Sequence, residues 1–108
     1  MDEGIEEKRK AKRFVYPCEV EFYGTGHGRI AGRITVLSVR GAFVESTVTE
    51  PVGTRITLRF ELPAGPMVLA AEVAHVEERG IGVHFLAMTR AQRVAFDKAL
   101  VEGPSKTA

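Results

Sequence analysis

The segment Ile56-Thr57-Leu58-Arg59-Phe60-Glu61-Leu62 decides the fold class of this chain of 108 residues. Its apolar residues occupy every even position, and this period of two places their side chains on one face of a β-strand. Turn-forming residues bound the segment, with Pro51 and Gly53 before it and Pro63 and Gly65 after it. A strand with one apolar face needs other strands to cover that face, so the segment predicts a β-sheet domain.

Five further segments have a strand-like character, and Gly or Pro residues separate most of them. They cover residues 18–22, 29–37, 42–45, 67–76 and 80–85, and Gly32 within the second marks a bend or a bulge. Six short strands in a chain of this length favour a closed antiparallel barrel over two packed sheets, because closure removes exposed sheet edges. The predicted fold class is therefore an all-β, six-stranded antiparallel barrel.

The period of the apolar residues changes near the end of the chain. Thr89 and Gln92 have the spacing of a capping box, and Phe96 and Leu100 stack one helical turn apart. These residues predict a single C-terminal α-helix. We expect one domain over residues 9–101, with a flexible N-terminal arm over residues 1–8 and a flexible tail over residues 102–108.

The composition limits the class of protein. The hydrophobic content is 44%, which supplies one core, and no apolar run approaches the roughly 20 residues that span a bilayer. We expect a cytoplasmic protein with no membrane partner. Cys18 is the single cysteine, which excludes an intramolecular disulfide, and its strand position predicts a buried small hydrophobe.

Catalytic chemistry has little support in the sequence. His27, His75 and His84 have no metal-ligand spacing, and no nucleophile stands beside a base. The adjacent acids Glu77 and Glu78 are typical of a solvated turn. The prediction is a protein that is not an enzyme and that has neither a metal nor a cofactor.

Charge is concentrated before the first predicted strand. Five of the six residues from Lys8 to Arg13 are cationic, whereas the formal net charge of the whole chain is only +1. Arg9 and Arg13 stand four residues apart in this run, and guanidinium groups suit anionic groups such as phosphate. An anionic ligand is the leading interpretation, and a solvated, disordered arm is the alternative.

Three motifs are spaced as in a known family. Arg9 and Arg13 precede the first predicted strand, the segment from Ser38 to Val44 reads Ser-x-x-Gly-Ala-Phe-Val, and the segment from Gly80 to Phe85 reads Gly-Ile-Gly-Val-His-Phe. With this arrangement, the chain resembles a PilZ domain over nearly all of residues 8 to 100. The resemblance implies a six-stranded antiparallel barrel with a C-terminal helix, and it implies binding of the second messenger cyclic di-GMP.

The resemblance also implies a ligand site. In the family, an arginine pair and an Asp/Asn-x-Ser-x-x-Gly motif hold the ligand, and the matching positions here are Arg9, Arg13, Ser38 and Gly41. The acidic or amide position falls on Val36, and no Asp or Asn occurs between Asp2 and Asp97. Weaker candidates are Lys12, Val36, Arg40 and His84. Gly41 is expected to allow a turn with positive φ, and both Ser38 and Gly41 also have an ordinary explanation as turn residues.

Three functional hypotheses follow. In the first, the protein is a cyclic di-GMP receptor whose arm folds over the barrel and which signals to a separate effector protein, in motility or another surface behaviour. In the second, it is a divergent PilZ adapter that does not bind the nucleotide and acts through protein contacts. A small-barrel nucleic-acid binder is the third and ranks last, because the chain has no tryptophan and a near-neutral charge. The sequence does not indicate an oligomeric state.

Overall fold

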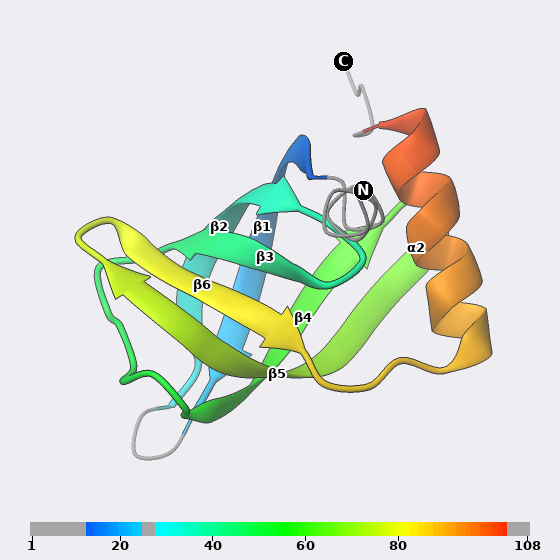
Figure 1. Ribbon diagram of the computed structural model, residues 1–108. Coiled ribbons are helices and arrows are strands. Elements are labelled where there is room, and N and C mark those ends of the chain that lie inside the picture. Colours follow the sequence, from blue (N-terminus) through cyan, green and yellow to red (C-terminus); the bar gives the residue numbers. More distant parts are fainter. Residues whose placement is uncertain (1–12, 25–27, 104–108) are drawn as a thin grey trace, which may run out of the picture.

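The computed structural model describes residues 13–24 and 28–103 of the chain. Six strands form a closed barrel in the order β1-β2-β3-β6-β5-β4, and all neighbouring strands are antiparallel. Figure 1 shows this barrel with helix α2 beside it. The elements are β1 (Phe14–Tyr23), β2 (Ile30–Leu37), β3 (Gly41–Glu45), β4 (Arg55–Leu62), β5 (Gly65–Glu77), β6 (Gly80–Phe85) and α2 (Arg90–Glu102). The predicted fold class is confirmed.

Two details of the strands differ from the sequence prediction. Strand β1 begins at Phe14 and not at Cys18, because a shift in register between Val15 and Cys18 accommodates Pro17, which has no N–H to donate to a neighbour. Strand β2 has no irregularity at Gly32, which pairs with Val20. The shift in its pairing with β3 lies between Ile34 and Val36. A proline inside a strand therefore masked the true start of β1.

The barrel interior holds the apolar side chains that alternation assigned to it. In β4, all four apolar residues of the predicted face are buried, and Leu58 has no exposed surface. The prediction that Cys18 is buried is only partly right, because Cys18 is half-buried at the margin of the core. Burial, followed by the neighbouring carboxylate of Glu19, raises the pKa of its thiol. The thiol therefore stays protonated at neutral pH.

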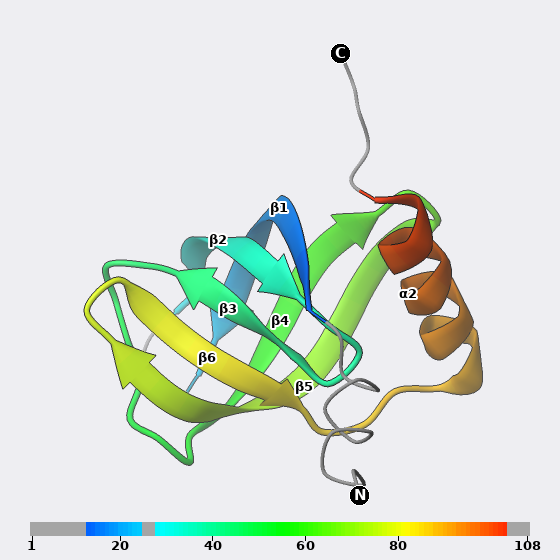
Figure 2. The same ribbon diagram turned by 45° about the horizontal axis from the view of Figure 1, so that its top comes forward.

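Helix α2 covers the barrel next to β4 and β5, as Figure 1 and Figure 2 both show. The predicted capping box is present, since the Thr89 hydroxyl accepts from Gln92 N at 3.0 Å and Gln92 Oε1 accepts from Thr89 N at 2.9 Å. Phe96 is fully buried and meets the rings of Phe60 and Phe85 edge to face, with centroids 6.5 and 5.5 Å away. The helix thus extends the barrel core.

Close packing of strand backbones explains the glycine at the start of β6. A Cβ atom on Gly80 would overlap the carbonyl oxygen of Val44 in β3. Glycine is therefore needed at this position for β3 and β6 to approach. Within residues 13–24 and 28–103, no helix has the length and apolarity needed to cross a membrane.

Candidate functional site

The pairing of β1 with β2 brings two predicted site residues to one end of the barrel. Phe14 of β1 lies opposite Leu37 of β2. Arg13, which precedes β1, and Ser38, which follows β2, are therefore the next residues beyond that pair. Arg13 is exposed and Ser38 is buried. Arg9 and Lys12, together with the predicted arm, lie outside the described residues. The tertiary structure therefore places one arginine of the basic run beside the Ser-x-x-Gly motif.

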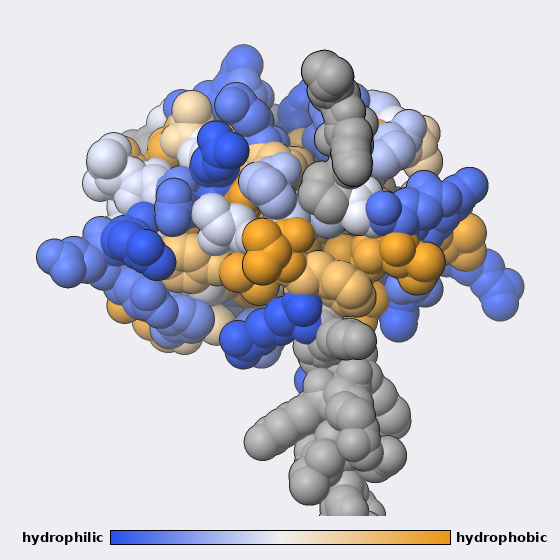
Figure 3. Space-filling view, turned by 90° about the horizontal axis from the view of Figure 1, so that it is seen from above, coloured by the Kyte–Doolittle hydropathy of each residue, from blue (hydrophilic) through white to orange (hydrophobic). Residues whose placement is uncertain are grey.

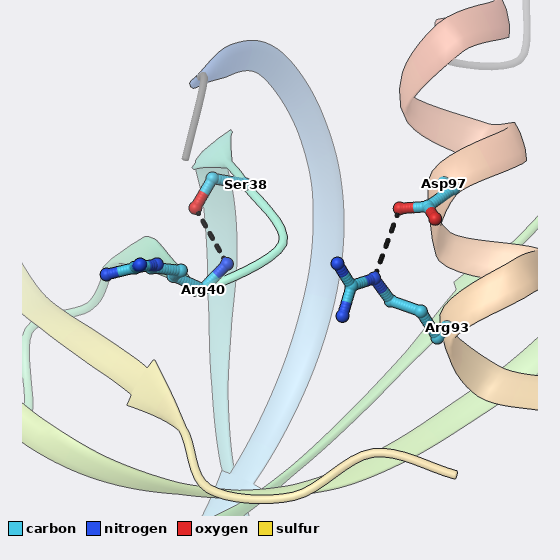
Figure 4. A network of polar contacts seen from close by, with 4 residues as sticks. All are labelled: Ser38, Arg40, Arg93 and Asp97. Carbon is cyan, nitrogen blue, oxygen red and sulfur yellow. Dashed lines mark hydrogen bonds and ion pairs between the residues drawn. The ribbon is translucent and has the colours of Figure 1, made fainter. Parts of the chain in front are cut away.

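Ser38 holds the turn between β2 and β3 in place. Its hydroxyl accepts hydrogen bonds from Arg40 N at 3.1 Å and Gly41 N at 3.2 Å, and it donates to the Gly41 carbonyl at 3.4 Å. The Ser38 N–H also donates to the Gly41 carbonyl, at 2.9 Å. Figure 4 shows this serine and Arg40 at the turn, with the Arg40 side chain pointing away from α2. The hydroxyl therefore has a structural role in this turn.

Replacing Ser38 by alanine is expected to destabilise the fold. The substitution removes the acceptor for two backbone N–H groups in a buried turn, and an unsatisfied buried polar group costs about 1 to 3 kcal/mol. Urea denaturation followed by circular dichroism measures the loss of unfolding free energy. Ser46→Ala is the matched control, because the Ser46 hydroxyl accepts from one backbone N–H in a part-buried turn. A Ser38→Ala variant as stable as wild type would contradict this role.

Gly41 has a different role from the one predicted. Among the described glycines only Gly53, Gly65 and Gly103 have positive φ, so the expectation of positive φ at Gly41 is wrong. A Cβ atom on Gly41 would overlap the Val83 carbonyl oxygen and would lie 3.2 Å from the Cα atom of His84. Glycine is needed here because β3 and β6 approach closely.

The weaker candidates lie around this turn. Arg40 is exposed, and its carbonyl accepts from Phe85 N at 2.8 Å. His84 is exposed on β6 directly opposite Gly41, whereas Val36 is half-buried on β2 opposite Phe43. Successive residues on one face of a strand are about 7 Å apart, so these positions occupy neighbouring rows of one surface.

Helix α2 carries a further cation toward this end of the barrel. The Arg93 Nε atom lies 3.4 Å from Asp97 Oδ1, one turn along the helix. In Figure 4 the Arg93 guanidinium points from α2 toward β1. Sequence reasoning did not select Arg93, because only its place in the tertiary structure distinguishes it from other helix cations.

Sequence reasoning also missed an aromatic pair on the outer face. Phe43 and His75 stack with ring centroids 6.2 Å apart and planes inclined by 24°. Alternation within β3 holds a signal for Phe43, because Ala42 and Val44 are the inward residues of that strand. The place of His75 depends on a shift in register between Val73 and His75, which the sequence pattern does not reveal.

Other parts of the molecule suit an anion less well. A pocket of about 550 Å³ lies near the other end of β2 and β3, but its lining combines Arg33 and Arg79 with Glu45 and Glu78. Among the described residues, no three His, Cys, Asp or Glu side chains are grouped in a way that could hold a metal.

Viewed from above, the molecule carries a band of apolar residues between hydrophilic ones (Figure 3).

The fold and the surface around Ser38 define a class of protein. It is a small closed barrel with a C-terminal helix and with an arginine beside a serine-glycine turn. A family model described as PilZ domain matches residues 7–102, and the chain belongs to this family. PilZ domains are regulatory receptors for cyclic di-GMP and not enzymes. A search of curated proteins found no match.

Solved structures with the same fold include two PilZ domains and an inhibitor of motility. The PilZ domain of CeSA from a cellulose-synthesizing bacterium is 17% identical with a TM-score of 0.70, over 85% of this chain and 97% of that one. The PilZ domain of Escherichia coli YcgR, solved with c-di-GMP, is 12% identical with a TM-score of 0.72, over 88% and 90% of the two chains. The Bacillus subtilis inhibitor of motility MotI/DgrA is 14% identical with a TM-score of 0.77, and the match covers 87% of this chain but 50% of MotI.

Proposed function

We propose that this protein is a receptor for cyclic di-GMP that passes the signal to a separate effector protein, in motility or another surface behaviour. The observation that carries the proposal is the register of β1 with β2, which sets Arg13 next to Ser38. The family membership and the YcgR structure with c-di-GMP support the same ligand. The proposed ligand site comprises Arg9, Arg13, Ser38 and Gly41.

The chemistry of these residues suits a cyclic dinucleotide. The exposed Arg13 guanidinium offers forked donors to a phosphate or to a guanine edge, and Arg9 lies four residues earlier in the chain. Gly41 is buried against β6 and contributes to the site by forming the turn with Ser38. Arg40 and His84 border the turn and supply further donors. Arg9, Arg13 and Arg40 together provide several positive groups for a ligand with two phosphates.

Ordering of the N-terminal segment is the proposed switch. Each backbone residue that becomes fixed costs about 1 to 2 kcal/mol of conformational entropy. A ligand with two phosphates and two guanines makes enough charge-assisted contacts to offset such a cost. The changed surface around Arg13 and the turn at Ser38 would then be the surface that an effector recognises.

Val36 weakens the recognition of guanine at one position. Its side chain has no acceptor for the ring and amino donors of the base, and an unpaired buried donor costs about 1 to 3 kcal/mol. Val36→Asp is therefore expected to tighten cyclic di-GMP binding by roughly 5- to 150-fold. Isothermal titration calorimetry with cyclic di-GMP measures this change, and Val68→Asp places the same charge at an exposed position on β5.

The same titration separates the receptor from the adapter. Binding by the wild-type protein supports the receptor proposal. No binding by wild type, with binding restored by Val36→Asp, would instead favour an adapter that has lost the nucleotide through this substitution. No binding by either protein would contradict the receptor proposal.

A further inference from the structure

One row of residues crosses the outer face of the barrel beside the proposed site. Strand pairing sets Val15 opposite Val36, Val36 opposite Phe43, and Phe43 opposite Gly82, which in turn lies opposite His75. Val15 is 79% exposed, Phe43 and Val36 are half-buried, and His75 is exposed. The row therefore offers an apolar and aromatic surface to solvent across five adjacent strands.

Phe43 is on this surface and not in the core. Its strand neighbours Ala42 and Val44 belong to the buried core cluster, whereas Phe43 is neither in the cluster nor packed against it. An aromatic ring of this size at a half-buried position keeps part of its apolar area in contact with solvent. The ring is available to a ligand.

The His75 ring occupies the space that Gly82 leaves free. A Cβ atom on Gly82 would overlap the imidazole, lying only 2.6 and 2.7 Å from its two nitrogens. Glu77 Oε2 lies 3.1 Å from His75 Nε2 and helps to hold the ring in place. Two features thus position His75 on Phe43. Gly82 of β6 leaves space for the imidazole, and the Glu77 carboxylate of β5 contacts it.

Val36 lies on the other side of Phe43 from His75, opposite Phe43 in the next strand and about 5 Å away. A planar base resting on Val36 would continue the stack of Phe43 and His75 by one layer. Val36 offers such a base no polar partner for its edge, but it gives an apolar floor beneath it. The surface therefore suits the face of a purine better than its edge.

We infer that Phe43 and His75 form a stacking platform for one guanine of the bound cyclic dinucleotide, and that this guanine lies over Val36. The inference rests on the proposed function and names how one base is held. Stacking on an aromatic side chain contributes as much as the hydrogen bond that Val36 cannot make. The platform thereby compensates for the missing acidic or amide residue.

Loss of the platform is expected to weaken cyclic di-GMP binding by about 5- to 150-fold, the effect of one base stacked on an aromatic ring. Titration calorimetry compares wild type with Phe43→Ala and His75→Ala, whereas Phe43→Tyr keeps the ring and should bind as wild type does. Gly82→Ala should reproduce the effect of His75→Ala, because the new methyl group displaces the imidazole. Tyr23→Ala removes an exposed aromatic residue at the far end of β1 and should bind normally.

A fluorescent analogue with 2-aminopurine in place of one guanine reports the stack itself. Its emission should be quenched on binding to wild type and to Phe43→Tyr, and much less on binding to Phe43→Ala at saturating protein. If wild type binds cyclic di-GMP, and if Phe43→Ala and His75→Ala bind with the same affinity and the same quenching as wild type, the platform is overturned. The receptor proposal would still stand. No binding of cyclic di-GMP by wild type would overturn both.

Discussion

A protein in which Arg9 and Arg13 are both replaced by alanine is expected to lose cyclic di-GMP binding by about two to four orders of magnitude. Each hydrogen-bonded contact with a charged group contributes about 1.5 to 3 kcal/mol, and the double variant removes at least one such contact at each arginine. The effect should exceed that of any other binding variant discussed above. Titration calorimetry at constant salt concentration measures it.

Arg55→Ala/Arg59→Ala is the matched control for this experiment. These arginines are also four residues apart, and both are exposed on β4, which is not among the strands that flank the serine turn. The control changes the net charge by the same two units, so it separates specific contacts from general attraction of an anion. Equal loss of binding in both double variants, or none in the first, would contradict a specific arginine contact.

Gly41→Ala is expected to cost about 3 kcal/mol of unfolding free energy or more, the largest effect on stability among the substitutions considered. The new methyl group would overlap the Val83 carbonyl oxygen and crowd the Cα atom of His84, and backbone atoms in a paired strand cannot move aside singly. Strands β3 and β6 would separate where Gly41 pairs with His84, and the barrel would open between them. Urea denaturation and the midpoint of thermal unfolding measure the loss.

Gly28→Ala controls for the general effect of replacing glycine by alanine. A Cβ atom on Gly28 meets no atom of the described residues within 4 Å, and Gly28 has no positive φ. Its replacement should leave stability unchanged or raise it slightly, because alanine lowers the entropy of the unfolded chain. A stable Gly41→Ala variant would mean that β3 and β6 do not pack as closely as described.

Much of the fold could be predicted because it follows from local patterns. The even apolar positions from Ile56 to Leu62 are buried, and Thr89 caps a helix that buries Phe96. Periodicity identifies which residues share a face, and it does so from neighbours in the sequence alone. Pro17 shows the limit of local reading, since the register shift that admits it depends on the partner strand.

The candidate site was predicted less completely. The motif placed Ser38 and Gly41 correctly in one turn, but it gave Gly41 a conformational role where close packing against Val83 is the observed one. Arg9 lies outside the described residues, so its part in the site stays a prediction. Phe43 and His75 were not selected, because nothing in the sequence near either residue indicates the other.

The sequence by itself determined the strand faces, the capped helix, the cluster of positive charge and the family motif, since each depends on residues a few positions apart. Only the tertiary structure decided that Arg13 lies beside Ser38 and that His75 fills the space over Gly82 to stack on Phe43. A period of two specifies the side of a strand on which a residue lies but not the residue opposite it. That choice depends on register between distant segments, which the packing of the whole barrel sets.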